Sequence, residues 1–324
     1  MRARLSDRDC ARATMTPSTP TLPKPPPELR DVTDDASLAQ AVAALGPAPQ
    51  ACLLCAASAP VRLFERFGKA HWRCDACRFV WVHDLYPEFV IRDAPEVVLE
   101  VFLGSAKRRN DPRSWPGMFA EFEPYRSGGK LLDVGCGPGF LVAEAARRGW
   151  RGYGVETQRV LADHARDELD AEVFHGELLD AGYEDGTFDV IHLNEVIEHV
   201  IDPVALLREI HRVLRPGGLA YLRTGCVESW AARWRGEDWP YFGFGPGGHI
   251  RFYGPTSAKA LGRAAGFTDV RTSTRGFALR EGGELKGHWY KPLVRALQGP
   301  VSSLATLCNA GHRLTMRFVK DARG

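Results

Sequence analysis

The stretch KLLDVGCGPGF, residues 130–140, decides the fold class of this 324-residue chain. An apolar strand pattern runs directly into Gly135, Gly137 and Gly139, and a helical pattern begins at Phe140. Glycines at a strand-to-helix turn let a ligand lie against the backbone. A dinucleotide fingerprint would need a glycine at the sixth position of the turn, and no Gly-Lys-Ser/Thr of a phosphate-binding loop follows. The turn therefore predicts a nucleotide-like ligand of a different kind.

Downstream of this turn, short apolar runs alternate with helical patterns, which predicts an α/β fold with a parallel sheet built of βαβ units. We expect strands at 130–135, 151–156, 171–176, 188–194, 218–224 and 267–273. We expect helices at 140–149, 157–169, 203–214 and 257–266. The C-terminal stretch predicts a further helix at 292–308 and then an edge strand at 312–320.

The composition excludes several classes of protein. With 44% hydrophobic residues the chain can bury a full core, and 42 basic against 40 acidic residues leave a formal charge of +2, which argues against a global polyanion-binding surface. No uninterrupted apolar run reaches the roughly 18 residues of a membrane helix. Eight cysteines without a secretory signal do not resemble a disulfide scaffold. We expect a soluble, cytoplasmic protein without a membrane span.

The N-terminal third precedes the alternating pattern and divides into three parts. A Pro-dense stretch predicts a largely disordered leader over 1–46, with an Arg-rich transit peptide as the weaker alternative. Residues 47–92 contain two cysteine pairs, and residues 93–127 read as a helical linker or cap.

The two cysteine pairs predict a zinc ribbon. Cys52-x2-Cys55 is followed after 18 residues by Cys74-x2-Cys77, a spacing typical of four-thiolate zinc sites. Four thiolates fill the tetrahedron, so the Zn²⁺ would be structural. Four unrelated buried thiols and a redox CxxC are the weaker alternatives. We expect a ribbon that is cored separately from the sheet.

From about residue 120 to 275 the chain resembles the class I S-adenosylmethionine-dependent methyltransferases, whose first motif is an acidic residue followed by GxGxG. The resemblance includes Asp133 with the glycine turn, Glu156 at the end of the second strand, and the stretches 176–203 and 215–225. It implies a Rossmann-like fold with a mostly parallel seven-stranded sheet and an antiparallel last strand, and S-adenosyl-L-methionine as the cofactor. The methyltransferase domain would then span 128–324, with a helical insertion at 284–309.

The resemblance also implies roles for individual residues. Asp133 would order the glycine turn or meet the amino-acid part of the cofactor, and Glu156 would accept hydrogen bonds from the ribose hydroxyls. Glu177 would face the adenine amino group with Leu178 beside the ring, although a helix cap or a surface acid is an equal alternative for Glu177. The expected cofactor-binding set is Asp133, Gly135, Gly137, Gly139, Glu156, Glu177, Leu178 and Asn194.

The substrate side is expected after the fourth and fifth strands. The run NEVIEH, residues 194–199, resembles the small-molecule branch that includes ubiquinone-type O-methyltransferases, and the Asn/Asp-Pro-Pro-aromatic motif of nucleobase enzymes is absent. The aromatic segment 229–253 predicts a mobile lid, with a hydrophobic cluster as the alternative. His249 is the first candidate general base and His199 the second. His249 tying the segment to residues 251–253 is the competing interpretation.

These observations favour a methyltransferase that acts on a small-molecule acceptor, expected to be a hydroxyl of a saccharide or secondary metabolite. An RNA base methyltransferase is the first alternative, but residues 51–92 carry a net +2 that four thiolates and one Zn²⁺ would bring to zero, so nucleic acid is an unlikely partner. A non-catalytic cofactor-binding partner protein is the second alternative. The acceptor atom and the oligomeric state stay open.

Overall fold

The computed structural model describes residues 48–66, 69–83, 99, 102–103, 115–243, 248–277 and 291–322, and the side chains of 291–297 are not described. The predicted leader, most of the predicted linker and part of the predicted helical insertion lie outside these residues. Within them, no helix has the length and apolar character needed to cross a membrane.

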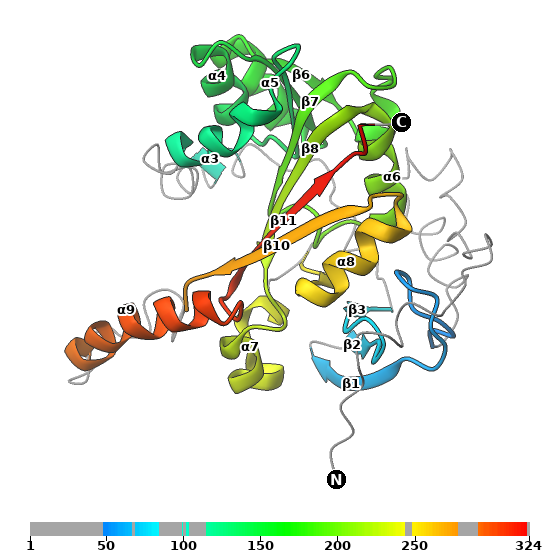
Figure 1. The fold of residues 1–324 in the computed structure, drawn as a ribbon, viewed down its shortest axis with the longest axis vertical. Coiled ribbons are helices and arrows are strands. Elements are labelled where there is room, and N and C mark those ends of the chain that lie inside the picture. Colours follow the sequence, from blue (N-terminus) through cyan, green and yellow to red (C-terminus); the bar gives the residue numbers. More distant parts are fainter. Residues whose placement is uncertain are drawn as a thin grey trace.

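A seven-stranded sheet forms the centre of the molecule (Figure 1). Its strands are β4 (Lys130–Val134), β5 (Arg151–Glu156), β6 (Glu172–His175), β7 (Phe188–Asn194), β8 (Leu214–Gly225), β10 (Asp269–Arg275) and β11 (Arg313–Val319). They lie in the order β10-β11-β8-β7-β4-β5-β6, and every pairing except those of β11 is parallel. The predicted Rossmann-like methyltransferase sheet is confirmed.

The last strand was predicted correctly as antiparallel but wrongly as an edge strand. β11 lies between β10 and β8 and pairs with both over its whole length, which leaves β10 at the edge. The alternation in its sequence reflects the burial of Leu314, Met316 and Phe318 on one face of the sheet. Alternation reports a buried face, and an interior antiparallel strand satisfies it as well as an edge strand does.

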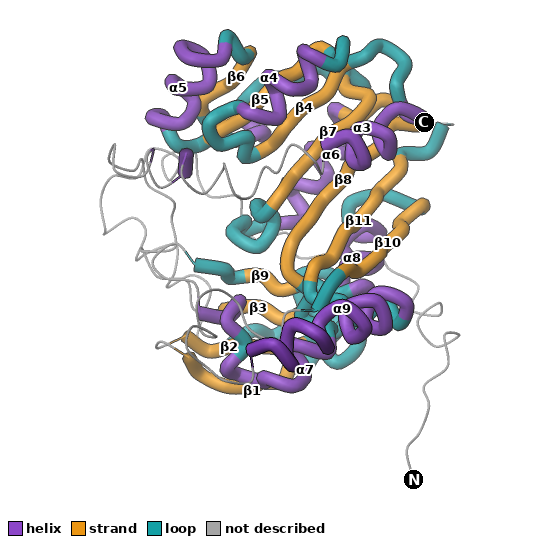
Figure 2. The backbone as a smooth tube through the Cα atoms, turned by 90° about the vertical axis from the view of Figure 1, so that its left-hand side faces the viewer, coloured by secondary structure: helices purple, strands orange, loops and turns teal. Residues whose placement is uncertain are grey.

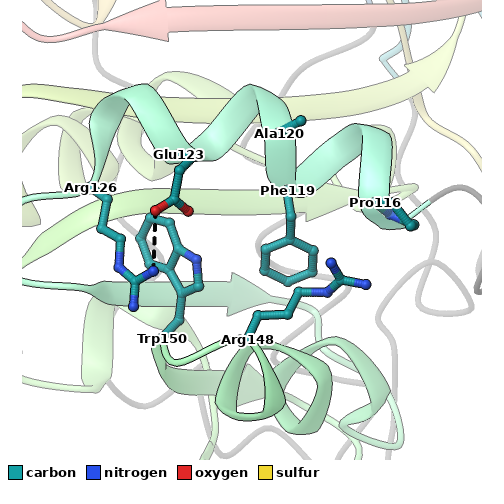
Figure 3. A pocket seen from close by; sticks show the side chains of 7 residues that line it. All are labelled: Pro116, Phe119, Ala120, Glu123, Arg126, Arg148 and Trp150. Carbon is teal, nitrogen blue, oxygen red and sulfur yellow. Dashed lines mark hydrogen bonds and ion pairs between the residues drawn. The ribbon is translucent and has the colours of Figure 1, made fainter.

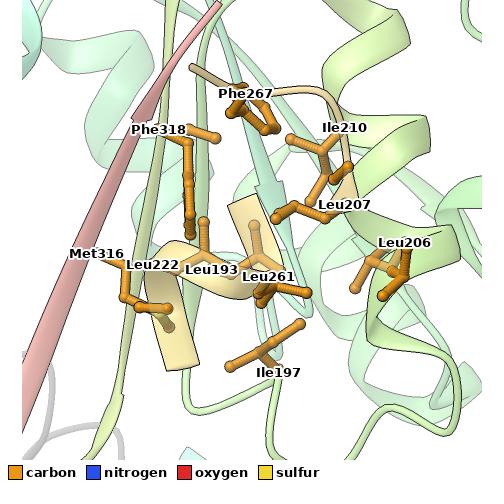
Figure 4. Close-up of a cluster of buried hydrophobic side chains, with 14 of the residues drawn as sticks. Leu193, Ile197, Leu206, Leu207, Ile210, Leu222, Leu261, Phe267, Met316 and Phe318 are labelled. Atoms are coloured by element: carbon orange, nitrogen blue, oxygen red, sulfur yellow. The ribbon is translucent and has the colours of Figure 1, made fainter. Parts of the chain in front are cut away.

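Helices cover both faces of this sheet. The helices that the structure describes are α3 (Trp115–Phe122), α4 (Phe140–Arg147), α5 (Arg159–Leu169), α6 (Pro203–Val213), α7 (Trp230–Arg235), α8 (Pro255–Ala264) and α9 (Lys291–Leu307), of which α7 and α9 lie at one end of the sheet and not over a face (Figure 1). α6 and α8 lie on one side and α3 on the other (Figure 1). α6 begins after Asp202, whose carboxylate accepts hydrogen bonds from the N–H groups of Val204 and Ala205. Its apolar face joins the main core, which includes Leu207, Ile210 and residues of α8 and β11 (Figure 4).

The segment that contains the four cysteines contributes three strands to a second, smaller sheet. It consists of β1 (Val61–Arg66), β2 (Lys69–Arg73), β3 (Val80–Val82) and β9 (Arg251–Phe252), all antiparallel. Its fourth strand thus comes from the segment after β8, and β9 lies between the ribbon strands and the large sheet (Figure 2). We use the word ribbon for residues 51–83.

The expectation of a separately cored ribbon is wrong. Cys52, Phe79 and Trp81 belong to the same buried cluster as Ile197, from the loop after β7, and Tyr253, which directly follows β9. Phe79 stacks on Trp81 with ring centroids 5.4 Å apart, and its ring lies 5.2 Å from that of Tyr253. The ribbon is therefore built into the main core, because a sheet of so few residues buries its apolar side chains only against the larger domain.

Candidate functional site

The glycine turn lies at the carboxyl end of β4. Gly135, Gly137 and Gly139 all have positive φ, at 71°, 54° and 82°, a conformation that a side chain disfavours. A Cβ on Gly139 would come within 2.6 Å of Cβ of Ala165, whereas a Cβ on Gly137 would meet nothing within 4 Å. Gly139 is thus required for packing of the turn against α5, and Gly137 presents open backbone that a ligand can approach.

Glu156 ends β5 directly beside this turn. One carboxylate oxygen accepts a hydrogen bond from Gly137 N and the other from Gln158 N, each at 2.8 Å. Burial raises the pKa of the Glu156 carboxyl, and these two N–H donors act in the opposite direction. Because a carboxylate has about four lone-pair positions, Glu156 retains acceptor capacity for a ligand hydroxyl.

Asp133 points across the sheet rather than only along the turn. Its Oδ1 lies 2.7 Å from Nδ1 of His192, its neighbour on β7, and both side chains are buried. The carboxylate accepts this hydrogen bond, so Nδ1 of His192 carries a proton. His192 was not predicted as a site residue, because only the register between β4 and β7 brings it next to Asp133.

The other expected cofactor residues lie at the same edge of the sheet. Glu177 is exposed just after β6, and Leu178, which begins the short 3-10 helix η5 (Leu178–Asp180), is buried in the main core. Asn194 is the last residue of β7. The fold therefore brings the carboxyl ends of β4, β5, β6 and β7 together, and with them the residues predicted to bind the cofactor. Open α/β sheets bind their ligands at this end of the strands.

A hollow of about 490 Å³ lies at the amino ends of β4 and β5, away from this site (Figure 3). Arg126 and Trp150 are among its lining residues, and they precede β4 and β5. The guanidinium of Arg126 pairs with Glu123 at 3.2 Å, and that of Arg148 lies 4.8 Å above the ring of Phe119. Both cations already have partners in the hollow, which gives no sign of a ligand.

Two histidines and a glutamate gather beyond the ends of β7 and β8. One ligand atom from each of Glu198, His199 and His249 lies within 4.8 Å of the others. Nδ1 of His249 is 2.9 Å from the carbonyl oxygen of Tyr241, and because a carbonyl only accepts, this nitrogen carries the proton. Nε2 of a neutral His249 ring is then an unprotonated base, 3.9 Å from Oε1 of Glu198.

Tyr241 connects this cluster to the ends of the strands, and the sequence analysis assigned it no role of its own. Its hydroxyl lies 2.5 Å from Oε1 of Glu198 and 3.1 Å from Oε2 of Glu195, and it accepts a hydrogen bond from Gly225 N at 2.9 Å. Burial, together with the nearby Glu195 carboxylate, raises the pKa of Glu198 to about 8, against the effect of the Tyr241 hydroxyl. Its aromatic segment was noticed, but no motif marks the tyrosine.

This cluster is able to do two kinds of chemistry. An unprotonated imidazole nitrogen can accept a proton from a hydroxyl that reaches it. A carboxylate with two imidazoles at ligand distance is also a set that suits a divalent cation such as Zn²⁺.

The described part of the aromatic segment 229–253 is packed rather than open. Trp239, Tyr241, Phe242 and Phe252 are buried in a cluster that also contains Val80 and Val82 of the ribbon. Trp234 is the exception, with 70% of its surface exposed. The hydrophobic cluster that was the alternative interpretation describes these aromatics, and residues 244–247 lie outside the described part of the chain.

The four ribbon cysteines bring their sulfur atoms together. Sγ of Cys52 lies 3.5 Å from that of Cys77, Sγ of Cys55 lies 3.6 Å from that of Cys74, and all four lie within 4.8 Å of one another. Zn–S bonds of about 2.3 Å in a tetrahedron place sulfur atoms about 3.8 Å apart, so the residues fit a zinc ion. In each knuckle the first cysteine donates its N–H to the carbonyl five residues later.

Known proteins share the features of the larger domain. The family model described as methyltransferase domain matches residues 107–272, just over half of the chain. A ubiquinone biosynthesis O-methyltransferase of Idiomarina loihiensis is 31% identical over 172 residues, which cover 48% of this chain and 70% of that protein. One of Ralstonia nicotianae is 34% identical over 143 residues, covering 39% of this chain and 60% of that protein.

Two further proteins are similar to this chain over different lengths. An uncharacterized 37.1 kDa protein in a transposon of Streptomyces fradiae is 34% identical over 113 residues, which are 33% of each chain. The crystal structure of an S-adenosylmethionine-dependent methyltransferase from Archaeoglobus fulgidus has a TM-score of 0.49 and 16% identity, covering 68% of this chain and 99% of that one. The chain thus spans between a third and 70% of the length of these curated relatives. From the family match and the sheet order, the chain belongs to the methyltransferase domain family and has the class I S-adenosylmethionine-dependent methyltransferase fold.

Proposed function

We propose that this protein transfers a methyl group from S-adenosyl-L-methionine to a hydroxyl of a small molecule, a saccharide or secondary metabolite, and that His249 accepts the hydroxyl proton. The observation that carries the proposal is the hydrogen bond from His249 Nδ1 to the Tyr241 carbonyl, which leaves Nε2 as a base. The similarity to ubiquinone biosynthesis O-methyltransferases supports transfer to oxygen.

The proposed cofactor site is the edge formed by the glycine turn and Glu156. Open backbone at Gly137 would contact the cofactor, and the remaining lone pairs of Glu156 would accept ribose hydroxyls. Asp133, Gly135, Gly139, Glu177, Leu178 and Asn194 complete the proposed set. When bound, S-adenosyl-L-methionine supplies a methyl group already activated by its sulfonium charge.

The chain's own residues would contribute alignment and proton removal. As the methyl group passes from the sulfonium of the bound cofactor to the acceptor oxygen and leaves S-adenosylhomocysteine, Nε2 of His249 would accept the proton of the hydroxyl. His199, whose ring centroid lies 4.9 Å from that of His249, is the second candidate for the base. Tyr241 would hold His249 through its carbonyl and Glu198 through its hydroxyl.

For the ribbon we propose one structural Zn²⁺ bound by Cys52, Cys55, Cys74 and Cys77. The support is the close set of four sulfur atoms and the two knuckles that present them. Four thiolates leave no open coordination position, so the ion would stabilise the fold rather than take part in methyl transfer.

The test uses cofactor carrying a deuterated methyl group. The purified protein is incubated with it and with three acceptor pools, namely hydroxylated small molecules, small amines, and transcribed RNA, and products are identified by mass spectrometry. We expect label only on oxygen of a small molecule, with one S-adenosylhomocysteine formed per methyl transferred. Label on RNA would favour the RNA methyltransferase alternative, and cofactor binding without any product would favour a non-catalytic partner protein.

A further inference from the structure

Strand β9 touches the ribbon on one side and the histidine cluster on the other. Arg251 pairs with Trp81 of β3, and Phe252 pairs with Val80. The N–H groups of Ile250 and Arg251 both donate to the carbonyl oxygen of Glu198, at 2.9 and 3.1 Å. Residues 250–252, which comprise β9 and the residue before it, are thus the backbone link between the ribbon and the loop that carries Glu198 and His199.

The side chain of Arg251 makes the same link a second time. Its Nη1 donates to the carbonyl of Val82, at the end of β3, at 2.9 Å, and its Nη2 donates to the carbonyl of Ile201 at 2.7 Å. Nη1 also lies 3.1 Å from the carbonyl of Ile250, just before β9. The guanidinium therefore holds the ribbon, β9 and the far end of the loop 195–202 in one arrangement.

A buried arginine at this position is not explained by its contribution to core packing. Arg251 is 2% exposed, and burial lowers the pKa of its guanidinium to about 10, with the charge of Asp202 acting in the opposite direction. A buried cation whose side-chain hydrogen bonds go to neutral carbonyls stabilises a fold less than an apolar side chain of similar volume would. What the planar fork of donors provides instead is fixed geometry between three carbonyls of three segments.

We propose that Arg251 is a positioning residue through which the ribbon keeps Glu198 and His199 in place beside His249. The inference rests on the proposed function, because it assigns the ribbon a part in building the proton-accepting site. The ribbon presents Val82, Arg251 connects Val82 to Ile201, and the loop that ends at Ile201 carries both side chains. The ribbon would thus be a wall of the active site as well as a zinc-binding unit.

Two variants and one control test this proposal. Arg251→Gln removes the cation and most donors, whereas Arg251→Lys retains a cation with three donors that can reach some of the carbonyls. Arg73→Gln is the matched control, because Arg73 lies in the ribbon and pairs with Asp75 at the surface. Each variant is measured for turnover, for S-adenosylhomocysteine affinity by calorimetry, and for the tautomer of His249 by ring ¹⁵N shifts, assigned with His249→Ala.

We expect Arg251→Gln to lower kcat by about 10²-fold, as a displacement near 1 Å at a reacting group does, with unchanged S-adenosylhomocysteine affinity. His249 should lose its preference for the tautomer with the proton on Nδ1, Arg251→Lys should be intermediate in both readouts, and Arg73→Gln should match the wild type. A purely structural role would lower the melting temperature and leave kcat of the folded enzyme and the His249 tautomer unchanged, which would overturn the proposal.

The two proposals fail in distinguishable ways. If the wild type methylates no hydroxyl, the proposed function is wrong, and the ¹⁵N tautomer measurement still decides the role of Arg251. If the wild type is active and both Arg251 variants keep its kcat and its His249 signals, only the positioning role is wrong. Failure of both variants to fold would also overturn it, because Arg251 would then serve stability alone.

Discussion

His71 should make the stability of this protein depend on pH, because it is buried where the ribbon meets the aromatic segment. It is 1% exposed, its ring stacks on that of Phe64 with centroids 4.5 Å apart, and it lies 5.2 Å from Phe242 and 5.6 Å from Phe252. Burial lowers the pKa of His71 to about 4, and the nearby charges of Arg66 and Lys69 act in the same direction, against the hydrogen bond to the Lys69 carbonyl.

The sign and the size follow from proton linkage. Below an unfolded pKa of about 6.5 the unfolded chain binds a proton that the folded chain does not take up until about pH 4, so stability falls as the pH falls through this window. Between pH 6.5 and 5.0 the loss is 1.5 pH units at about 1.36 kcal/mol each, or about 2 kcal/mol.

Urea unfolding at pH 7.5 and pH 5.0 measures this loss. His71→Phe keeps an aromatic ring in the stack and cannot titrate, so its free energy of unfolding should fall by about 2 kcal/mol less than that of the wild type between the two pH values. Other titrating groups, including the four ribbon cysteines, are common to both proteins and cancel. His164→Phe, on α5, should behave as the wild type. Equal losses in the wild type and His71→Phe would refute the burial of this ring between the ribbon and the aromatic segment.

Three further predictions concern the turn, the cluster and the cysteines. Gly137→Ala should weaken S-adenosylhomocysteine binding at least about tenfold by calorimetry, because its Cβ would occupy the open face of the turn. Gly236→Ala, with a similar φ of 57° and equally open surroundings, should bind normally. Normal binding by Gly137→Ala would remove the turn from the cofactor site. Without added divalent cations, Glu198→Gln should be more stable than the wild type by up to about 4 kcal/mol at pH 7.5, and by less at pH 5. The reason is that the raised pKa of Glu198 makes the stability of the wild type fall as the pH rises from about 4.5 to 8. A gain in stability that does not change with pH would contradict the burial of this carboxyl. Cys74→Ser should lose zinc by elemental analysis and lower the melting temperature of the whole chain in one transition, because the ribbon shares the main core; full thermal stability, or a ribbon that melts alone, would count against that shared core.

Much of the larger domain could be predicted from the sequence because its signals are local. The glycine turn and the strand and helix periods that follow it each depend on a few consecutive residues, and the resemblance then implied a mostly parallel seven-stranded sheet with an antiparallel last strand. The spacing of Cys52, Cys55, Cys74 and Cys77 similarly predicted that four sulfur atoms would meet, because each pair needs only one tight turn.

The parts that were missed depend on contacts between distant segments. β9 has two residues and pairs with β3 about 170 positions earlier, a partnership that no local pattern marks. The bond between Asp133 and His192 requires the register of β4 against β7, and Tyr241 reaches Glu198 only because the aromatic segment folds back onto the strand ends. The surface that buries Trp239, Tyr241 and Phe242 was not predicted for the same reason, since aromatic residues in a glycine-rich loop do not reveal which apolar surface they will pack against.

The kcat of His249→Gln, measured across pH, decides whether Nε2 of His249 accepts the proton of the acceptor hydroxyl. General-base catalysis is typically worth about 10²–10⁴-fold, so kcat should fall within that range, the pH dependence of kcat should lose its imidazole limb, and S-adenosylhomocysteine affinity should stay unchanged. His164→Gln serves as the control. If His249→Gln weakens substrate binding but retains the wild-type kcat and its pH profile, His249 is not the base, and His199 becomes the residue to test.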